Sequence, residues 1–309
     1  MMQQGLGRFV LRRAAVAAVT VLLVSSAAFG LIHFGPGDHV SGFGLEMDPA
    51  VARAERHRLG LDRPFVQQYA GWVRNAARLD FGESLKYRRP VGELVRERAG
   101  NTALLGVVAL LLATGIGIPA GVLTATSQGP FAAVVRAASF ALVSVPPLVT
   151  AFVLLMVASA TGWFPVGGAG TSLHLFLPAL ALALPLAAML ERLQSQAMRD
   201  VIGEPSIRAA AARGCSDTRL VWRHMFRLSL GPVVAVYGVV IGTVLSGSLV
   251  VEVVMSWPGL GALTQEALIA RDLYLVAGCA AAAATFLALG VLSSDLLHAV
   301  TDPRVVERT

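Results

Sequence analysis

"EPSIRAAAARGCSDTRLVWRHMFRLSLGP", residues 204–232, is a polar island in a chain whose other long segments are mostly apolar. It carries five arginines and a run of alanines that leads to Gly214. The whole chain has 309 residues, of which 55% are hydrophobic and only 14% are charged. Soluble domains usually have about 25% charged residues. Apolar residues gathered into long runs with so little charge indicate an integral membrane protein.

Six apolar segments are long enough to cross a hydrocarbon layer of about 30 Å, which needs about 20 helical residues. The predicted spans run roughly over residues 12–34, 101–124, 133–158, 173–191, 233–255 and 274–299. The first could be a cleaved signal peptide, but its apolar run of about 20 residues favours a retained signal anchor. The sequence therefore predicts an all-α polytopic membrane protein with one transmembrane domain over residues 1–309.

The distribution of arginine predicts the orientation, because cytoplasmic loops are enriched in Arg and Lys. Residues 192–232 hold seven arginines, whereas residues 159–172 hold none. We therefore place the N-terminal residues 1–11 and the 192–232 loop in the cytoplasm, and six spans return the C-terminus to the same side. Residues 35–100 carry 11 cations and nine acids, and we place this segment outside.

The external segment contains two stretches with helical spacing of apolar residues. They are "DPAVARAERHRLGL" at 48–61 and "FVQQYAGWVRNAARL" at 65–79. Pro64 stands just before the second stretch, where a proline favours a helix start. We therefore expect two short external helices rather than a loose linker.

Motifs for catalysis, nucleotides and metals are absent from the sequence. The only lysine, Lys86, follows Ser84 and Leu85, so the chain cannot build a G-x-x-x-x-G-K-[ST] phosphate loop. It contains no H-E-x-x-H, no paired-cysteine spacing and no G-x-S-x-G; Cys215 and Cys279 are expected to be free thiols. We expect no catalytic residue, bound cofactor or metal in this chain, which disfavours a membrane enzyme.

Prolines break two of the predicted spans, at "SVPPL" (144–148) and "ALP" (183–185). Such prolines are tolerated where neighbouring helices or a cavity satisfy the freed carbonyls. They are either packing kinks or a wall of a translocation path. The candidate lining residues are Ser144, Pro146 and Pro185.

The first half of the polar island reads as a short helix from Glu204 to Arg213. Glu204 and Arg208 stand four residues apart and form a possible ion pair. The residues Ile207, Ala210 and Ala211 make one small apolar face that a partner's groove can approach closely. Gly214 is well placed as the C-terminal stop.

The second half reads as a basic amphipathic helix, with Ser216 as its N-cap and Asp217 in its first turn. Leu220, Val221, Met225 and Leu228 occupy one face, and Arg219, Arg223 and Arg227 recur every four residues on another. Pro232 is expected to start the next span. These helices suit docking to a soluble partner or, equally, contact with anionic lipid headgroups.

"RAAAARG" at 208–214 resembles the cytoplasmic loop of ATP-binding-cassette (ABC) importer permeases of the dipeptide/oligopeptide/nickel family. The residues that fit the family pattern are Arg208, Ala210, Ala212, Arg213, Gly214, Arg223, His224, Arg227 and Pro232. Where an acid and an aromatic residue usually precede the run, this chain has Pro205 and Ser206. Other matching pieces, in order, are "FGPGD", "LGLDRPFVQQY", "DFGESL", "RPVGELVRER", "TGWFP", "LPALALALPLAA", "SWPGLGAL", "ARD" and "DPR".

The resemblance covers the whole chain and implies a type I importer permease fold in a bacterial inner membrane. It implies a heterodimer with a second permease, two cytoplasmic ATPases that bind ATP and Mg, and an external solute-binding protein. The implied ATPase-coupling residues, within the 204–216 helix and beyond it, are Glu204, Arg208, Ala210, Ala211, Arg213, Gly214, Arg223 and Arg227. The implied external gate or partner contact comprises Trp257, Pro258, Gly259 and Gly261.

The main hypothesis from the sequence is a non-catalytic permease subunit that moves peptides or similar small solutes inward. The alternative is an ATP-independent secondary transporter or channel. Nothing in the sequence separates dipeptides, oligopeptides, nickel chelates and glutathione as the solute.

Overall fold

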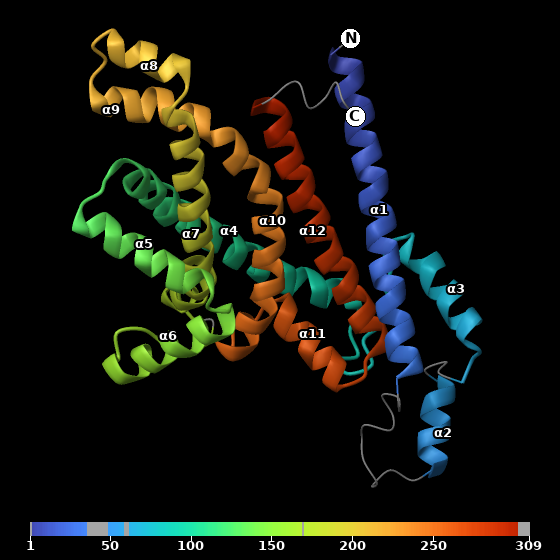
Figure 1. Cartoon of the computed structure of the whole chain (residues 1–309). Helices are drawn as coiled ribbons and strands as arrows, with labels where there is room; N and C mark the ends of the chain where they lie inside the picture. The colour runs from blue at the N-terminus through green and yellow to red at the C-terminus, as the bar shows by residue number, and fades with distance from the viewer. Residues whose placement is uncertain (1, 36–48, 59–61, 169, 302–309) are drawn as a thin grey trace. The chain divides into compact units, whose positions relative to one another are not determined.

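The computed structural model describes residues 2–35, 49–58, 62–168 and 170–301. Within these ranges the secondary structure is helical, and the only β-type pairing is an isolated bridge between Glu83 and Pro90. The all-α prediction is confirmed. The helices in chain order (Figure 1) are α1 (Met2–Phe34), α2 (Pro49–Arg58), α3 (Phe65–Ala76), α4 (Val91–Thr126), α5 (Pro130–Val143), α6 (Pro147–Thr161), α7 (Leu173–Ile202), α8 (Pro205–Ala212), α9 (Asp217–Arg219), the π-helical η2 (Leu220–Met225), α10 (Phe226–Val254), α11 (Leu260–Ile269) and α12 (Leu273–Thr301).

Five helical stretches of the described chain are long and apolar enough to cross a membrane. They are Leu11–Phe34, Val91–Thr126, Leu173–Ile202, Asp217–Val254 and Leu273–Ser293. The helices α5 and α6 make a sixth span only if they are counted as one broken element, because they are bent by 114° at their junction. These elements correspond to the six predicted spans, and the third of them is not a continuous helix.

Prolines act differently at the two predicted breaks. Between α5 and α6, Pro146 and Pro147 both lack an N–H, so two successive helical hydrogen bonds cannot form and the chain turns. The break predicted at 183–185 is wrong, because α7 continues through Pro185. One missing hydrogen bond inside a well-packed membrane helix is tolerated.

Several helices extend beyond the predicted spans. Helix α4 begins at Val91 rather than near residue 101, and α7 ends at Ile202 rather than 191. Pro232, predicted to start a span, lies inside α10. The apolar segments of the sequence mark only the part of each helix that crosses the hydrocarbon layer. The helices continue beyond that layer with more polar turns. The two helices predicted over 48–61 and 65–79 are confirmed as α2 and α3, and their external location stays a prediction. Helix α11 was not predicted.

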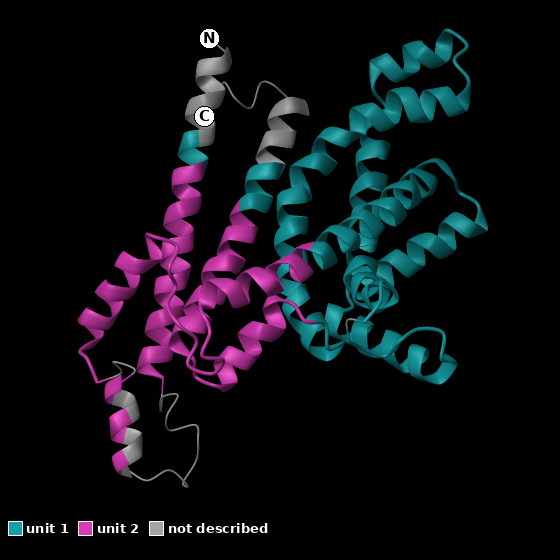
Figure 2. Ribbon diagram, turned by 180° about the vertical axis from the view of Figure 1, so that it is seen from behind, with its two compact units in different colours: residues 1–13, 104–257, 289–309 teal, residues 14–103, 258–288 magenta. Residues whose placement is uncertain are grey.

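The chain groups into two compact units (Figure 2). Unit 1 contains Met1–Arg13, Leu104–Trp257 and Leu289–Thr309, and unit 2 contains Ala14–Ala103 and Pro258–Ala288. Whether the two units act as the single domain predicted from the sequence stays a prediction.

Helix α7 is the centre of unit 1, where it contacts α5, α6, α8 and α10. It also meets α4 at very short range. A Cβ atom placed on Gly117 would lie 2.5 Å from the carbonyl oxygen of Ala187, and one on Gly121 would lie 2.6 Å from that of Glu191. The two glycines therefore let the backbones of α4 and α7 touch, as small residues do in membrane helix pairs.

Unit 2 is built on aromatic contacts between α1 and α3. The ring centroids of Phe29 and Trp72 lie 5.2 Å apart, and Phe29 is fully buried. Ser26 and Tyr69 share a hydrogen bond of 2.7 Å between their hydroxyls. Helix α3 therefore lies along the C-terminal turns of α1.

The close approach of α4 and α7 leads to a prediction about the stability of the folded chain. We expect Gly117→Ala to destabilise the purified chain, because an overpacked methyl group typically costs about 1–3 kcal/mol. Gly115→Ala is the matched control, since a Cβ there meets nothing within 4 Å and alanine favours the helix by up to about 1 kcal/mol. Thermal unfolding in detergent should show a lower Tm for the first variant only. Equal Tm values for the two variants would contradict the contact.

Candidate functional site

The predicted lining residues Ser144, Pro146 and Pro185 surround one cavity of ≈ 280 Å³ within unit 1. Ser144 follows the end of α5, Pro146 precedes α6, and Pro185 lies inside α7. The structure thus brings together two proline motifs that are about forty residues apart in the sequence. Their function as a path lining stays a prediction.

The cavity wall is mostly apolar. Only Ser144 and Thr243 contribute polar side chains, and the hydroxyl of Thr243 already donates to the carbonyl of Val239 at 2.9 Å. The apolar residues of the wall include Val143, Val145, Pro147, Leu182, Leu186 and Met189. Among its lining residues there is neither a titratable group nor a metal ligand.

Helix α8 forms where the sequence predicted the docking helix. Pro205 occupies its first position, where the missing N–H costs nothing. The carbonyl of Glu204 accepts from the amides of Ile207 and Arg208, both at 3.1 Å. Gly214 has φ +75, the left-handed conformation that glycine adopts without strain. The predicted helix and its stop at Gly214 are confirmed.

The predicted docking face of α8 is wrong in part. Ile207 and Ala210 are only 4% and 3% exposed, and Ile207 packs against the chain's own Val122 and Met198. A helix turns by about 100° per residue, so the opposite face carries Arg208, Ala209 and Ala212, and all three are exposed. Ala211, also exposed, lies between the two faces. The outward face is therefore small and basic, while the apolar face anchors α8 to α4 and α7.

The predicted ion pair between Glu204 and Arg208 does not form. A guanidinium nitrogen of Arg208 lies 3.9 Å from where a Cβ on Gly203 would stand. No contact of 4 Å or less joins the guanidinium to the carboxylate of Glu204. Glu204 precedes the first helical turn, and from that position its side chain does not reach Arg208.

The predicted second helix starts as expected but does not remain separate. Ser216 is its N-cap, and α9, η2 and α10 follow without a break, so the arginine segment continues directly into a span. Leu220, Val221 and Met225 pack with the cluster that holds α8. Leu228, predicted on the same face, is 49% exposed. The wider π turns rotate the residues that follow, which moves Leu228 away from that face.

The remaining predicted coupling residues are accessible. Arg213, Arg223 and Arg227 are all exposed. Figure 1 shows α8 and α9 as a hairpin beyond the ends of α7 and α10, within unit 1. Contact of these arginines with an ATPase stays a prediction.

A buried polar layer joins α4, α7 and α10, and it was not predicted from the sequence. The hydroxyl of Thr124 hydrogen-bonds the carboxylate of Glu191, which is 1% exposed, and lies 3.1 Å from the hydroxyl of Ser195. One turn along, the amide of Gln194 donates to Ser229 at 2.8 Å. Three polar residues at positions i, i+3 and i+4 of an apolar helix were the signal that could have revealed this layer.

The loop predicted as an external gate has its two halves in different units, and each half has contacts within its own unit. Trp257 is 6% exposed and packs within unit 1, so its ring supports the loop from inside. In unit 2, Asn101 donates to the carbonyl of Pro258 at 2.7 Å, and the amide of Leu260 donates to Thr102 at 2.7 Å. Gly259 and Gly261 are buried beside them. Whether this loop contacts a partner stays a prediction.

In unit 2 a buried carboxylate joins two motifs of the predicted family. Asp272, from "ARD", is fully buried. It accepts hydrogen bonds from the hydroxyl of Ser84 at 2.6 Å, the amide of Lys86 at 3.0 Å and the amide of Leu275 at 3.1 Å. The "DFGESL" loop is therefore fixed to the start of α12, and Asp272 also satisfies an otherwise unpaired amide of that helix.

An ion pair extends this cluster to the surface. The Lys86 ammonium lies 3.1 Å from the carboxylate of Glu266, which also accepts from the Tyr87 hydroxyl. Partial burial lowers the pKa of Lys86, but the hydrogen bonds to Glu266 and Tyr87 outweigh it, so the pKa of Lys86 is raised above 10.5. Partial burial raises the pKa of Glu266, but the same two partners outweigh it and leave that pKa below 4.5.

A multi-pass helical chain with a basic helical hairpin and an apolar cavity has the features of a transporter subunit. Two family models match the chain. Residues 117–307 match the binding-protein-dependent transport system inner membrane component, and residues 6–102 match the N-terminal region of the same kind of membrane component. The chain belongs to this family, which has the type I importer permease fold.

Relatives match along nearly the whole length. The chain is 34% identical to the oligopeptide transport system permease protein AppB of Bacillus subtilis (strain 168), over 96% of this chain and 98% of that protein. It is 33% identical to the di/tripeptide transport system permease protein DppB of Pseudomonas aeruginosa (strain UCBPP-PA14) and 32% to the glutathione transport system permease protein GsiC of Escherichia coli (strain K12), at the same coverage. The chain is thus a membrane-spanning permease subunit of a binding-protein-dependent importer.

The ion pair at Glu266 makes a prediction about reactivity. Lys86 is the only lysine, so acylation by an amine-reactive ester, read by mass spectrometry of its peptide, reports on one side chain. Glu266→Gln removes the carboxylate, so we expect the pKa of Lys86 to fall and its neutral fraction at about pH 9 to rise. Acylation should become faster. Glu93→Gln, which removes one of the two carboxylate partners of Arg89, at 3.4 Å, is the control. An unchanged acylation rate in Glu266→Gln would refute the pairing of Lys86 with Glu266.

Proposed function

We propose that this permease subunit imports di- or oligopeptides. The observation that carries the proposal is the shared solute class of the relatives, whose names refer to oligopeptides, di/tripeptides and glutathione. Glutathione is itself a small peptide, so the three names describe one chemical class. The largely apolar cavity beside the α5–α6 break suits solutes that share a backbone but differ in side chains.

We infer that α8 is the helix that couples this chain to a cytoplasmic ATPase. Its outward face has alanines at 209 and 212, which allow close approach, and Arg208 for an acidic partner surface. Its inward residues pack against α4, α7 and η2. A shift of α8 would therefore be transmitted to several spans at once, as rigid-body coupling requires.

The assembly that fits this arrangement contains a second homologous permease, two ATPases that bind ATP and Mg, and an external solute-binding protein. The membrane would be a bacterial inner membrane, with both termini and α8 in the cytoplasm and residues 35–100 outside. In this proposal the chain itself catalyses nothing. An ion-driven carrier, the alternative, would take up the solute without an ATPase.

The coupling assignment predicts the effect of bulk on the outward face of α8. We expect Ala209→Trp to lower ATP-driven uptake of a labelled tripeptide by about tenfold or more, since each 1.4 kcal/mol lost at an interface is a tenfold loss of affinity. Membrane insertion and Tm should be unchanged, because Ala209 is exposed. Ala209→Ser is the matched control and should transport normally.

Two outcomes would contradict different parts of the proposal. Normal uptake by Ala209→Trp would reject α8 as the docking helix. Wild-type uptake that persists after ATP depletion but stops when the ion gradient is collapsed would instead support the carrier.

The proposed orientation is tested by two reagents that do not cross membranes. In intact spheroplasts a sulfonated amine-reactive ester should label Lys86, whereas a charged maleimide should label Cys215 only after permeabilisation. Cys279 is fully buried and serves as an internal negative control, and Cys215→Ser removes the maleimide signal. Labelling of Cys215 in intact spheroplasts would reverse the orientation.

A further inference from the structure

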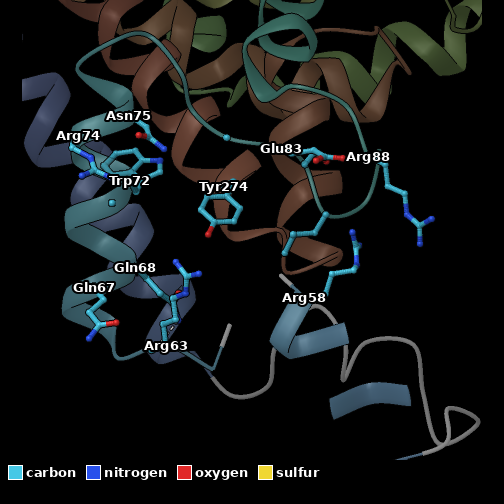
Figure 3. A pocket seen from close by; sticks show the side chains of 14 residues that line it. Arg58, Arg63, Gln67, Gln68, Trp72, Arg74, Asn75, Glu83, Arg88 and Tyr274 are labelled. Carbon is cyan, nitrogen blue, oxygen red and sulfur yellow. Dashed lines mark hydrogen bonds between the residues drawn. The ribbon is translucent and has the colours of Figure 1, made fainter. Parts of the chain in front are cut away.

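Unit 2 contains a second cavity that the proposed function does not use. It has a volume of ≈ 420 Å³ and is formed by α2, α3, the 82–88 loop and the start of α12 (Figure 3). Four arginines line it, against a single acid, Glu83. The arginines are Arg58, Arg63, Arg74 and Arg88. This excess of positive charge indicates an anionic ligand, and guanidinium groups match the oxygens of phosphate and carboxylate.

The wall of the cavity also carries hydrogen-bond donors without acceptors. Trp72 is 4% exposed, and its indole N–H is buried with no partner in the described chain. The hydroxyl of Tyr274 makes no hydrogen bond to the described residues, and Figure 3 shows it directed into the open space beside Arg63 and Gln68. A buried N–H without an acceptor is costly, and an anion in the cavity would supply one.

The packing of α3 places this cavity near a membrane surface. The span of α1 is 24 residues long, which at about 1.5 Å per residue is roughly 36 Å and exceeds the hydrocarbon layer of about 30 Å. The excess of about 6 Å corresponds to roughly one turn, so the last turn of α1 reaches the headgroup region. Phe65, the first residue of α3, packs on His33 and Phe34 in that turn. The start of α3, where Arg63 and Gln67 line the cavity, thus lies at headgroup depth.

The residue types agree with that depth. Phe65, Tyr69 and Trp72 line one side of α3 against α1, and Tyr and Trp concentrate where hydrocarbon meets water. Arg74 and Gln67 are exposed on the same helix. Arginine extends a long apolar stem from such a position and holds its charge among headgroups.

We propose that this cavity binds the phosphodiester group of an anionic phospholipid, such as phosphatidylglycerol, at the end of the membrane where α1 finishes. The rim arginines contact the phosphate oxygens, and Trp72 and Tyr274 donate to the headgroup. The acyl chains lie along α1 and α3. This site is independent of the peptide path, and its existence does not depend on the proposed solute or on ATPase coupling.

The test measures thermal unfolding of the full-length chain, purified in a neutral detergent, against added ligands. The probes are dioctanoyl phosphatidylglycerol, dioctanoylglycerol, which lacks the phosphate, and inorganic phosphate. We expect only phosphatidylglycerol to raise Tm. The double variant Arg74→Gln/Arg88→Gln should need at least about tenfold more of it for the same shift, since each charge-assisted bond is worth roughly a tenfold change in affinity.

Arg78→Gln/Arg96→Gln is the matched control, because it removes the same charge from exposed positions outside the cavity. Trp72→Phe keeps the aromatic packing but removes the donor, and it should also weaken the response. An equal response to inorganic phosphate would identify a soluble anion instead of a lipid and overturn the assignment. Equal weakening in the control pair, or no weakening in the cavity variants, would likewise overturn it. Tripeptide uptake, measured separately, tests the proposed function.

Discussion

The contact between α4 and α7 is the constraint on which the rest of unit 1 depends. Gly117 and Gly121 remove two side chains from α4 at the points where the carbonyl oxygens of α7 would otherwise collide with them. Within a bilayer, apolar side chains gain little by leaving lipid, so helix association relies on close packing. With α4 held this near, α7 can present its other sides to α5, α6 and α10.

The polar layer follows from that approach. The Thr124 hydroxyl reaches Glu191 across the interface only because the two backbones are close, one turn beyond Gly121. The hydrogen bond from Gln194 to Ser229 continues the layer to α10. Beyond it, the apolar cluster with Val122, Met198 and Met225 holds α8 through Ile207. Helix α8 is thus fixed to the same helices that the glycines and the polar layer hold together.

The sequence predicted where the helices lie along the chain better than it predicted which of their faces are buried. Hydropathy located the spans, and the small-residue run with Gly214 located α8, because both signals are local. Which face of α8 is buried depends on the cluster that includes Val122 of α4, which is distant in sequence, so the sequence alone predicts Ile207 and Ala210 on an open docking face. Leu228 was misplaced because a π turn changes the phase of a helix without a recognisable residue pattern. Of the lining residues, Ser144, Pro146 and Pro185 were identified by their prolines, whereas Trp72 and Arg74 of the second cavity were not, since their meeting depends on how α3 packs on α1.

Some parts of unit 1 are tightly packed and one junction is weakly constrained, which would allow several helices to move together. Around α8 the contacts are apolar and continuous, so α8, the end of α7 and η2 can move together. At the α5–α6 junction the helical hydrogen bonds are interrupted by Pro146 and Pro147. The bend of 114° can therefore change without breaking a continuous run of helical hydrogen bonds. The cavity with Ser144 and Pro185 lies at that junction. Under the coupling role proposed for α8, a displacement of α8 would move α7 as a stiff element. The structure would then change at the α5–α6 junction, where the backbone is least constrained and where the cavity with Ser144 and Pro185 lies.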